Sequence, residues 1–316
     1  MSSTNARQKF KLGKQAEKQH DFEAAKAFYS EGLDLDPDAS VADWEMLNKT
    51  PRAFPERRAI RAMLRIRLAD FTRNAYNESS KFGEDFQNPK VFMYWGQGFD
   101  AAPPIVQSAL RSTIAHHGRE NVVLIDDSNA HEWVNFPDRI WEIGKKYRTA
   151  FSDLLRVELL AEHGGIWSDA TCFSTESALG KFESMTNESG FFAFGKGSPG
   201  VISSWFMASR PHSYIACMMR DAMRLYWSVY DRPITYYYMH QIWLQLYRMD
   251  DRFRAYADRI PNLGVDPRAV NRAMLRQRSE VDVSSLLDGS FVHKLTYKNP
   301  PELVTKDTVA HYMTTI

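Results

Sequence analysis

The stretch at residues 151–173 reads FSDLLRVELLAEHGGIWSDATCF, and it places charged residues inside a very apolar segment. Its first half has the apolar density of a core helix, yet Asp153 and Arg156 stand three residues apart in it and would share one helix face. After a Gly-Gly pair the pattern changes to a short apolar strand that contains Asp169. Burying such charges without partners costs several kcal/mol, so the pattern predicts that a ligand satisfies them.

The surrounding sequence predicts an α/β fold. From about residue 90, short apolar runs such as KVFMYW, NVVLIDD, FFAF and SSWFMAS alternate with amphipathic segments, and the chain beyond residue 211 is largely helical. Such alternation favours a mostly parallel sheet with helices on both faces. Ligands of such sheets bind at the carboxyl ends of the strands. We therefore expect Trp95, Gly96 and Asp169 to converge on one crevice.

Each of these residues has a plainer interpretation when taken alone. Asp153 and Arg156 match a helix-face ion pair, Asp169 a strand-end turn residue, and Trp95 a core residue. Their joint occurrence in one βαβ region favours a site. On a strand over 166–173, Asp169 and Thr171 would share a face and reach a nucleotide's ribose and diphosphate, or a hydrated divalent cation.

Residues 6–38 predict a separate helical unit. The spacing resembles one 34-residue tetratricopeptide repeat (TPR), through Leu12, Gly13, Ala16, Ala25, Tyr29, Gly32 and Pro37. One repeat cannot bury its own face, so it must pack on the next helix, on the main domain or on a protein partner. We expect a helical TPR-like region over 1–80 and a second domain over 88–316.

Residues 55–76 predict an amphipathic helix with a basic face. The arginines of that face are Arg57, Arg58, Arg61, Arg65 and Arg73. Such a face is commonly solvated, and it also suits peripheral contact with an anionic membrane surface.

The bulk composition narrows the function classes. A formal net charge of +1 over 316 residues argues against a nucleic-acid binder. The two cysteines have no CxxC spacing, which favours buried thiols in a reducing compartment. The first residues carry no apolar run of a signal peptide, and no segment has the roughly 18 apolar residues of a membrane span. We expect a cytoplasmic protein, in peripheral contact with the inner face of the membrane if the basic helix binds there.

Three motifs also resemble a known family: YWGQGFDAAPPIV, VVLIDDSNAHEWV and FSDLLRVELLAEHGGIWSDAT. They are similar to capsular polysaccharide synthesis proteins, which belong with DXD-motif sugar transferases such as yeast-type mannosyltransferases and clostridial glucosylating toxins. The resemblance covers about 90–300 and includes SWFMASRP and VHKLTYK. It implies a GT-A fold, which is a Rossmann-like nucleotide-sugar-binding domain, and transfer with retention at the anomeric carbon.

The resemblance also implies donor-site roles. Trp95, next to Gly96, would stack on the base of the donor. Asp153 would contact the ribose or base, and Arg156 the donor sugar or its phosphates. Asp169 matches the first Asp of DXD, which holds the ribose, the sugar and the metal.

The second Asp of the DXD motif is replaced by Thr171, and a hydroxyl is a poor ligand for Mn²⁺ or Mg²⁺. The divalent cation is therefore in doubt: Asp169 would hold it with the diphosphate and a later residue, for which His293 is the candidate. Lys294 would offset charge on the leaving group, so we count Asp169, Arg156, His293 and Lys294 as catalytic candidates. The plain alternative for His293 and Lys294 is a surface strand end.

Acceptor contacts are expected from Trp205, His240 and Gln241. Trp205 could stack on a sugar face, although core packing explains it equally well. His240 and Gln241 lie in the aromatic segment YYYMHQIWLQL, where a satisfied core residue is the commoner outcome.

These expectations combine into a retaining glycosyltransferase. It would use a nucleotide sugar, most simply a UDP-sugar, and a glycan or lipid-linked acceptor in capsule or surface polysaccharide synthesis. The alternative is a catalytically degenerate fold that recruits a polysaccharide-synthesis partner through the TPR-like region. A nucleotide-sugar hydrolase and glycoside hydrolysis by paired carboxylates also stay open, because carboxylate separation is spatial.

Overall fold

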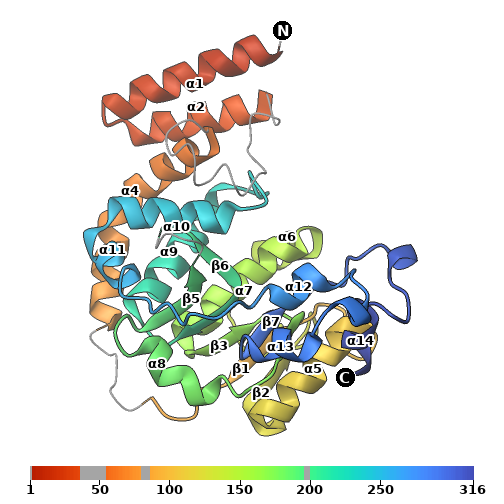
Figure 1. Ribbon diagram of the computed structural model, residues 1–316. Coiled ribbons are helices and arrows are strands. Elements are labelled where there is room, and N and C mark those ends of the chain that lie inside the picture. The colour runs from red at the N-terminus through yellow and green to blue at the C-terminus, as the bar shows by residue number, and fades with distance from the viewer. Residues whose placement is uncertain (1, 36–54, 80–85, 196–199) are drawn as a thin grey trace.

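The computed structural model describes residues 2–35, 55–79, 86–195 and 200–316. At its centre is a five-stranded sheet in the order β2-β1-β3-β6-β5 (Figure 1). The strands of this sheet are Val91–Tyr94 (β1), Val122–Ile125 (β2), Gly165–Ser168 (β3), Phe191–Gly195 (β5) and Ile202–Ser209 (β6).

The sheet is mixed, whereas the sequence predicted a mostly parallel one. Strand β1 pairs in parallel with β2 and β3, but β6 pairs antiparallel with both β3 and β5. Strands β5 and β6 are consecutive in the chain, and consecutive strands pair antiparallel without a crossover helix. The parallel half carries Asp169, directly after the carboxyl end of β3.

Helices cover both faces of the sheet, as the α/β prediction requires. On one face, Phe92 and Tyr94 of β1 pack in the cluster that contains α7 (Arg148–Glu162) and α9 (Tyr214–Val229). On the other, Val91 and Met93 pack with α5 (Pro104–His117) and α8 (Phe182–Thr186). The alternation of side chains along β1 explains this division.

The remaining helices of the main domain are shorter or more peripheral. They are α6 (Asp138–Lys146), α10 (Tyr238–Met249), α11 (Asp251–Ala257), α12 (Ala269–Ala273), α13 (Val283–Asp288) and α14 (Val309–Thr315). Cys172 and Cys217 are free and buried, in agreement with the sequence expectation.

The predicted strand over 166–173 is interrupted, which corrects the sequence analysis. Strand β3 ends at Ser168, a turn follows, and β4 (Cys172–Ser174) then pairs antiparallel with β7 (Val292–Lys294) in a separate two-stranded sheet. Asp169 and Thr171 therefore lie in a turn and do not share a strand face.

The N-terminal region is helical, as predicted. Helices α1 (Ser2–Lys18) and α2 (Phe22–Leu35) lie side by side at one end of the molecule (Figure 1). A Cβ added at Gly13 would lie 2.6 Å from the Tyr29 ring, so a glycine is needed for this close approach. The predicted terminal Pro37 lies outside the described residues.

Helix α4 (Pro55–Ser79) connects α1 and α2 to the main domain, because it packs against both α2 and α9. Its predicted basic face is partly used inside the protein. Arg57 is buried, and Arg58 and Arg61 form ion pairs with Glu17 of α1. Among the described residues, no helix has the length and apolar character needed to cross a membrane.

Candidate functional site

The candidate site lies at the carboxyl ends of the parallel strands. After β1, the backbone N–H of Trp95 donates to the Ile125 carbonyl at the end of β2. The half-buried indole of Trp95 meets the ring of Tyr297 edge to face, with centroids 5.4 Å apart. Sequence reasoning missed Tyr297, although it belongs to the VHKLTYK segment. Together these rings form a partly exposed aromatic pair.

Gly96 has a packing reason to be glycine. A Cβ at this position would lie 2.8 Å from Asp127 Oδ1 and 2.9 Å from the Tyr94 hydroxyl. Asp127 is fixed there because its carboxylate accepts hydrogen bonds from Tyr94 and from Arg148, both at 2.5 Å. The backbone at the end of β1 is thereby held against the start of α7.

Asp169 is the centre of a cluster of charged side chains. Its Oδ1 accepts hydrogen bonds from Trp167 Nε1 at 2.9 Å and from Arg156 Nη2 at 3.3 Å. Its Oδ2 accepts one from Lys294 Nζ at 2.7 Å. A quarter of the Asp169 side chain, 24%, stays exposed, so the carboxylate is accessible from one side.

Arg156 is almost fully buried, and α7 positions it. Its guanidinium pairs with Asp153 on the preceding turn at 2.9 Å, which confirms that the two share a face. It also donates to the Ser204 carbonyl of β6 at 2.9 Å and lies 5.1 Å from the centre of the Trp167 ring. These contacts fix the guanidinium between helix and sheet.

The two carboxyl groups of the cluster differ in pKa. Burial raises the pKa of Asp153 to about 6, although the charge of Arg156 opposes this shift. Burial would also raise the pKa of Asp169, but Lys294 and Arg156 outweigh it and hold that pKa below its usual value. Asp169 is thus the firmly ionised member of the pair.

Lys294 connects the two ends of the Asp169-Ala170-Thr171 turn. In the β4–β7 ladder it pairs with Cys172, which brings its ammonium over the turn. Its Nζ bonds Thr171 Oγ1 at 2.7 Å as well as Asp169 Oδ2 at 2.7 Å. Asp169 and Thr171 therefore both already bind a cation, the ammonium group of Lys294.

These side chains do not fit a divalent cation. Mn²⁺ and Mg²⁺ need several free oxygen ligands. Here both carboxylate oxygens of Asp169 accept from cationic or N–H donors, and the Thr171 hydroxyl is engaged by Lys294. A divalent ion would have to displace the ammonium of Lys294.

The structure does not bring His293 to Asp169. Neighbouring residues of a strand face opposite ways, so His293 points away from the face that carries Lys294. Its Nε2 lies 2.9 Å from the Leu287 carbonyl, and its ring is completely buried. Burial lowers the pKa of His293, so the ring is neutral near pH 7.

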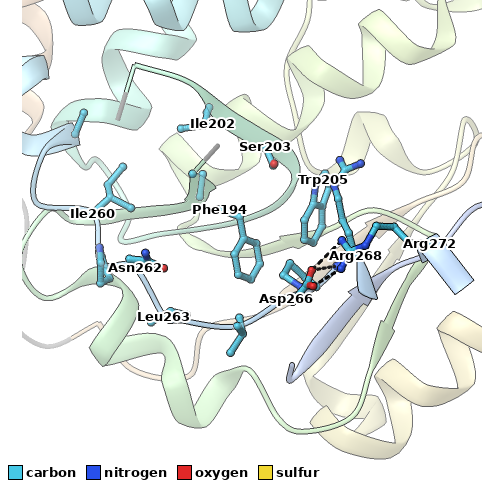
Figure 2. Close-up of a pocket in the computed structure, with 16 residues that line it drawn as sticks. Phe194, Ile202, Ser203, Trp205, Ile260, Asn262, Leu263, Asp266, Arg268 and Arg272 are labelled. Carbon is cyan, nitrogen blue, oxygen red and sulfur yellow. Dashed lines mark hydrogen bonds and ion pairs between the residues drawn. The ribbon is translucent and has the colours of Figure 1, made fainter. Parts of the chain in front are cut away.

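The expected acceptor residues come from two elements, Trp205 from β6 and the neighbours His240 and Gln241 from α10. The Trp205 ring stacks on Phe194 at 5.0 Å and borders a pocket shown in Figure 2. His240 meets Tyr237 edge to face at 5.7 Å, and Gln241 is completely buried in α10.

Tyr236 is a residue of the site region that sequence reasoning missed. Its side chain is 62% exposed, an unusual state for a large aromatic residue. Partial burial raises the pKa of Tyr236, and the charges of Asp153 and Asp169 raise it further, so the hydroxyl lies within their field. The run of three tyrosines at 236–238 was an available signal.

The family model of capsular polysaccharide synthesis proteins matches residues 45–313. The chain belongs to this family. The matched range contains the whole Asp169 cluster and begins after α2, so α1 and α2 lie outside it. A comparison with curated proteins found no match. Family membership associates the protein with capsular polysaccharide synthesis.

Proposed function

We propose that the protein is a glycosyltransferase that transfers a sugar from a UDP-sugar to a glycan or lipid-linked acceptor. The observation that carries this proposal is the position of Asp169, held by Arg156 and Lys294 at the carboxyl end of a parallel strand. Nucleotides bind at such strand ends in open α/β sheets. Family membership supports the same conclusion.

The donor would lie between the aromatic pair and the charged cluster. The base stacks on Trp95, beside Tyr297, because these rings form the partly exposed aromatic surface after β1. The exposed edge of Asp169 accepts hydrogen bonds from sugar or ribose hydroxyl groups. Asp153 acts mainly by holding Arg156, since the two are bonded at 2.9 Å and both are buried.

Lys294 and Arg156 would stabilise the leaving diphosphate. When the bond between the anomeric carbon and the phosphate oxygen breaks, negative charge develops on that oxygen, and fixed cations lower the energy of this state. In the retaining course that the resemblance implies, the acceptor oxygen bonds to the anomeric carbon on the same face. Its proton passes to the departing diphosphate.

Lys294 would also take the place of the divalent cation. It is bonded to Asp169 and Thr171, the two positions where the family motif implies metal ligands. Because Thr171 is neutral, Asp169 carries the only negative charge of these two positions, and the single positive charge of Lys294 balances it. We therefore propose donor binding that needs no divalent metal.

A thermal-shift screen tests this proposal. Wild type with a panel of UDP-sugars, in Mn²⁺ or in EDTA, should be stabilised by one sugar under both conditions, and Asp169→Ala should remove the shift. Lys294→Ala should weaken donor binding at least tenfold in EDTA. Mn²⁺ should restore part of that loss by occupying the freed oxygens. Lys306→Ala, at an exposed position, is the matched control.

The outcomes separate the parts of the proposal. If EDTA abolishes donor binding to wild type, metal independence is wrong while the transferase stands. If no UDP-sugar shifts wild type in either buffer, the transferase proposal is wrong.

One observation favours the alternative, a non-catalytic member that recruits a partner. The Asp169 carboxylate is fully paired by the chain's own cations, as in a purely structural cluster. Helices α1 and α2 lie outside the family match and would provide the recruiting surface. Donor binding without turnover, with capture of a polysaccharide-synthesis protein that requires α1 and α2, would support this alternative.

A further inference from the structure

A pocket of about 710 Å³ lies beside β6 and the segment that connects α11 to α12 (Figure 2). One wall is formed by Phe194 and Trp205, and the opposite side by Ile260, Leu263 and the residues that precede α12. None of these residues belongs to the donor site proposed above.

This pocket shares two walls with the Asp169 cluster. The backbone N–H of Asp169 donates to the Trp205 carbonyl at 2.8 Å, and that of Lys294 donates to the Pro267 carbonyl at 2.8 Å. Both Trp205 and Pro267 line the pocket. A ligand in the pocket would therefore contact Trp205 and Pro267, and these two residues bond directly to the backbone of Asp169 and Lys294.

The pocket wall holds one hydrogen-bond donor that has no partner in the described part of the chain. Trp205 is 5% exposed, and its indole Nε1 is buried without a hydrogen bond there. A buried N–H left unsatisfied is costly and rare in native proteins. It points to a ligand atom that accepts a hydrogen bond.

Arg268 supplies a positive charge beside that N–H. Its guanidinium lies 5.9 Å from the centre of the Trp205 ring, and no carboxylate of the described residues lies within 4.0 Å of it. Arg272 differs, because both of its Nη atoms bond the Asp266 carboxylate (Figure 2). The carboxylate of the pocket is thus neutralised, and Arg268 remains available for an anion.

The rest of the lining is apolar. Phe194, Ile202, Ile260, Leu263 and Val265 contribute carbon surface. Such a wall suits the C–H face of a pyranose ring, whereas the Trp205 ring is already stacked on Phe194. Phe194 occupies one face of the Trp205 ring, and Nε1 is the polar group that this side chain offers to a ligand.

We infer that this pocket binds the acceptor through an anionic glycan unit, a pyranose ring that carries a carboxylate or a phosphate. The inference rests on the proposed transferase function, because it assigns the pocket to the second substrate. A neutral glycan could satisfy the indole N–H, but it would leave the guanidinium of Arg268 without a counter-charge.

Binding measurements by isothermal titration calorimetry test this inference with matched probes. Hyaluronan tetrasaccharide supplies carboxylates, and N-acetylglucosamine 1-phosphate, a single sugar, supplies a phosphate. Chitotetraose is the neutral glycan equal in length to the hyaluronan probe. Wild type should bind one of the two anionic probes at least tenfold more tightly than chitotetraose, and the preferred probe identifies the anion. Arg268→Gln should reduce the affinity for that probe to the affinity for chitotetraose, whereas Arg268→Lys should keep most of the preference for the anionic probe.

Two further variants control for folding and for general charge. Arg276→Gln removes an exposed arginine outside the pocket, so it should bind like wild type. Trp205→Phe removes the indole N–H but keeps a ring against Phe194. It should therefore weaken binding of the preferred anionic probe several-fold, with little change in melting temperature.

Binding of the UDP-sugar identified above, measured on the same variants, separates this inference from the proposed function. Arg268→Gln should leave UDP-sugar affinity unchanged. If Arg268→Gln weakens UDP-sugar binding instead, the pocket is part of the donor site and the inference is wrong. The inference also fails if neither anionic probe binds more tightly than chitotetraose while the UDP-sugar still binds. An anionic preference that depends on Arg268 without any UDP-sugar binding would support the pocket and overturn the transferase.

Discussion

Two groups of three charged residues in this molecule have opposite compositions and different surroundings. One is an arginine with two aspartates, and the other is a glutamate with two arginines. In the main domain, Arg156 pairs with Asp153 and Asp169, and the side chains of Arg156 and Asp153 are only 5% and 7% exposed. In the N-terminal helices, Glu17 pairs with Arg58 and Arg61, and all three side chains keep between 16% and 32% of their surface exposed.

The difference in burial changes what each group contributes to stability. Exposed ion pairs contribute little, because water screens them and side-chain entropy opposes them. Buried pairs carry a large desolvation cost, so removing one partner leaves an expensive charge behind. We therefore propose that the group at the carboxyl end of β3 is kept for ligand binding and not for stability. Glu17 and its arginines have the simpler task of joining α1 to α4.

The largest expected effect comes from Arg156→Met. Asp153 would lose its charged partner while it stays buried, and removing one partner of a buried pair costs about 3–5 kcal/mol of unfolding free energy. Urea unfolding at pH 7.5 measures this loss. Adding Asp153→Asn to the variant should recover part of it, because the unpaired charge disappears. A loss below about 1 kcal/mol would contradict the view that the pair is energetically buried.

The second effect concerns the pH dependence of Asp153. The folded-state pKa of about 6 lies above the unfolded value near 4, so the native state holds a proton that the unfolded state has lost between these pH values. Stability relative to Asp153→Asn should therefore fall as the pH rises from about 4 to 6, by at most about 1.4 kcal/mol per unit, and stay constant above.

Urea unfolding of wild type and Asp153→Asn at half-unit steps measures that dependence. Glu176→Gln, which changes an exposed carboxylate paired with Lys181, is the control and should show no such window. If the stability difference rises with pH between 4 and 6, the carboxyl of Asp153 is stabilised in its ionised form and the buried-charge argument is wrong.

Sequence reasoning found the parts of the charged cluster that depend on local spacing. The three-residue offset of Asp153 and Arg156 placed them on one face, and they pair at 2.9 Å. The strand expected over 166–173 was wrong, because a turn at Asp169 interrupts it. Period-two patterns show apolar alternation, but they do not reveal where one strand is divided between two sheets.

Long-range pairing explains what the sequence could not indicate. Lys294 bonds Asp169 across 125 positions of the chain, through the register of β4 with β7. The sequence offered His293 and Lys294 together, and only the register decides which of the two faces Asp169. The same holds for the mixed sheet, since the order of β6 between β3 and β5 is set by tertiary packing.

The smallest effect should come from Glu17→Gln in the exposed group. The glutamine removes the charge but can still accept the hydrogen bond from the Tyr29 hydroxyl, which Glu17 accepts at 2.9 Å. We expect a loss of roughly 0.5 kcal/mol in unfolding free energy, and no measurable loss in 1 M NaCl, where charges are screened within about 3 Å. Glu31→Gln, which disrupts the exposed pair with Lys9, should behave alike, and UDP-sugar binding should be unchanged in both. A loss above about 2 kcal/mol, or weaker UDP-sugar binding, would place Glu17 with the buried group, because only charges withdrawn from solvent have effects of that size.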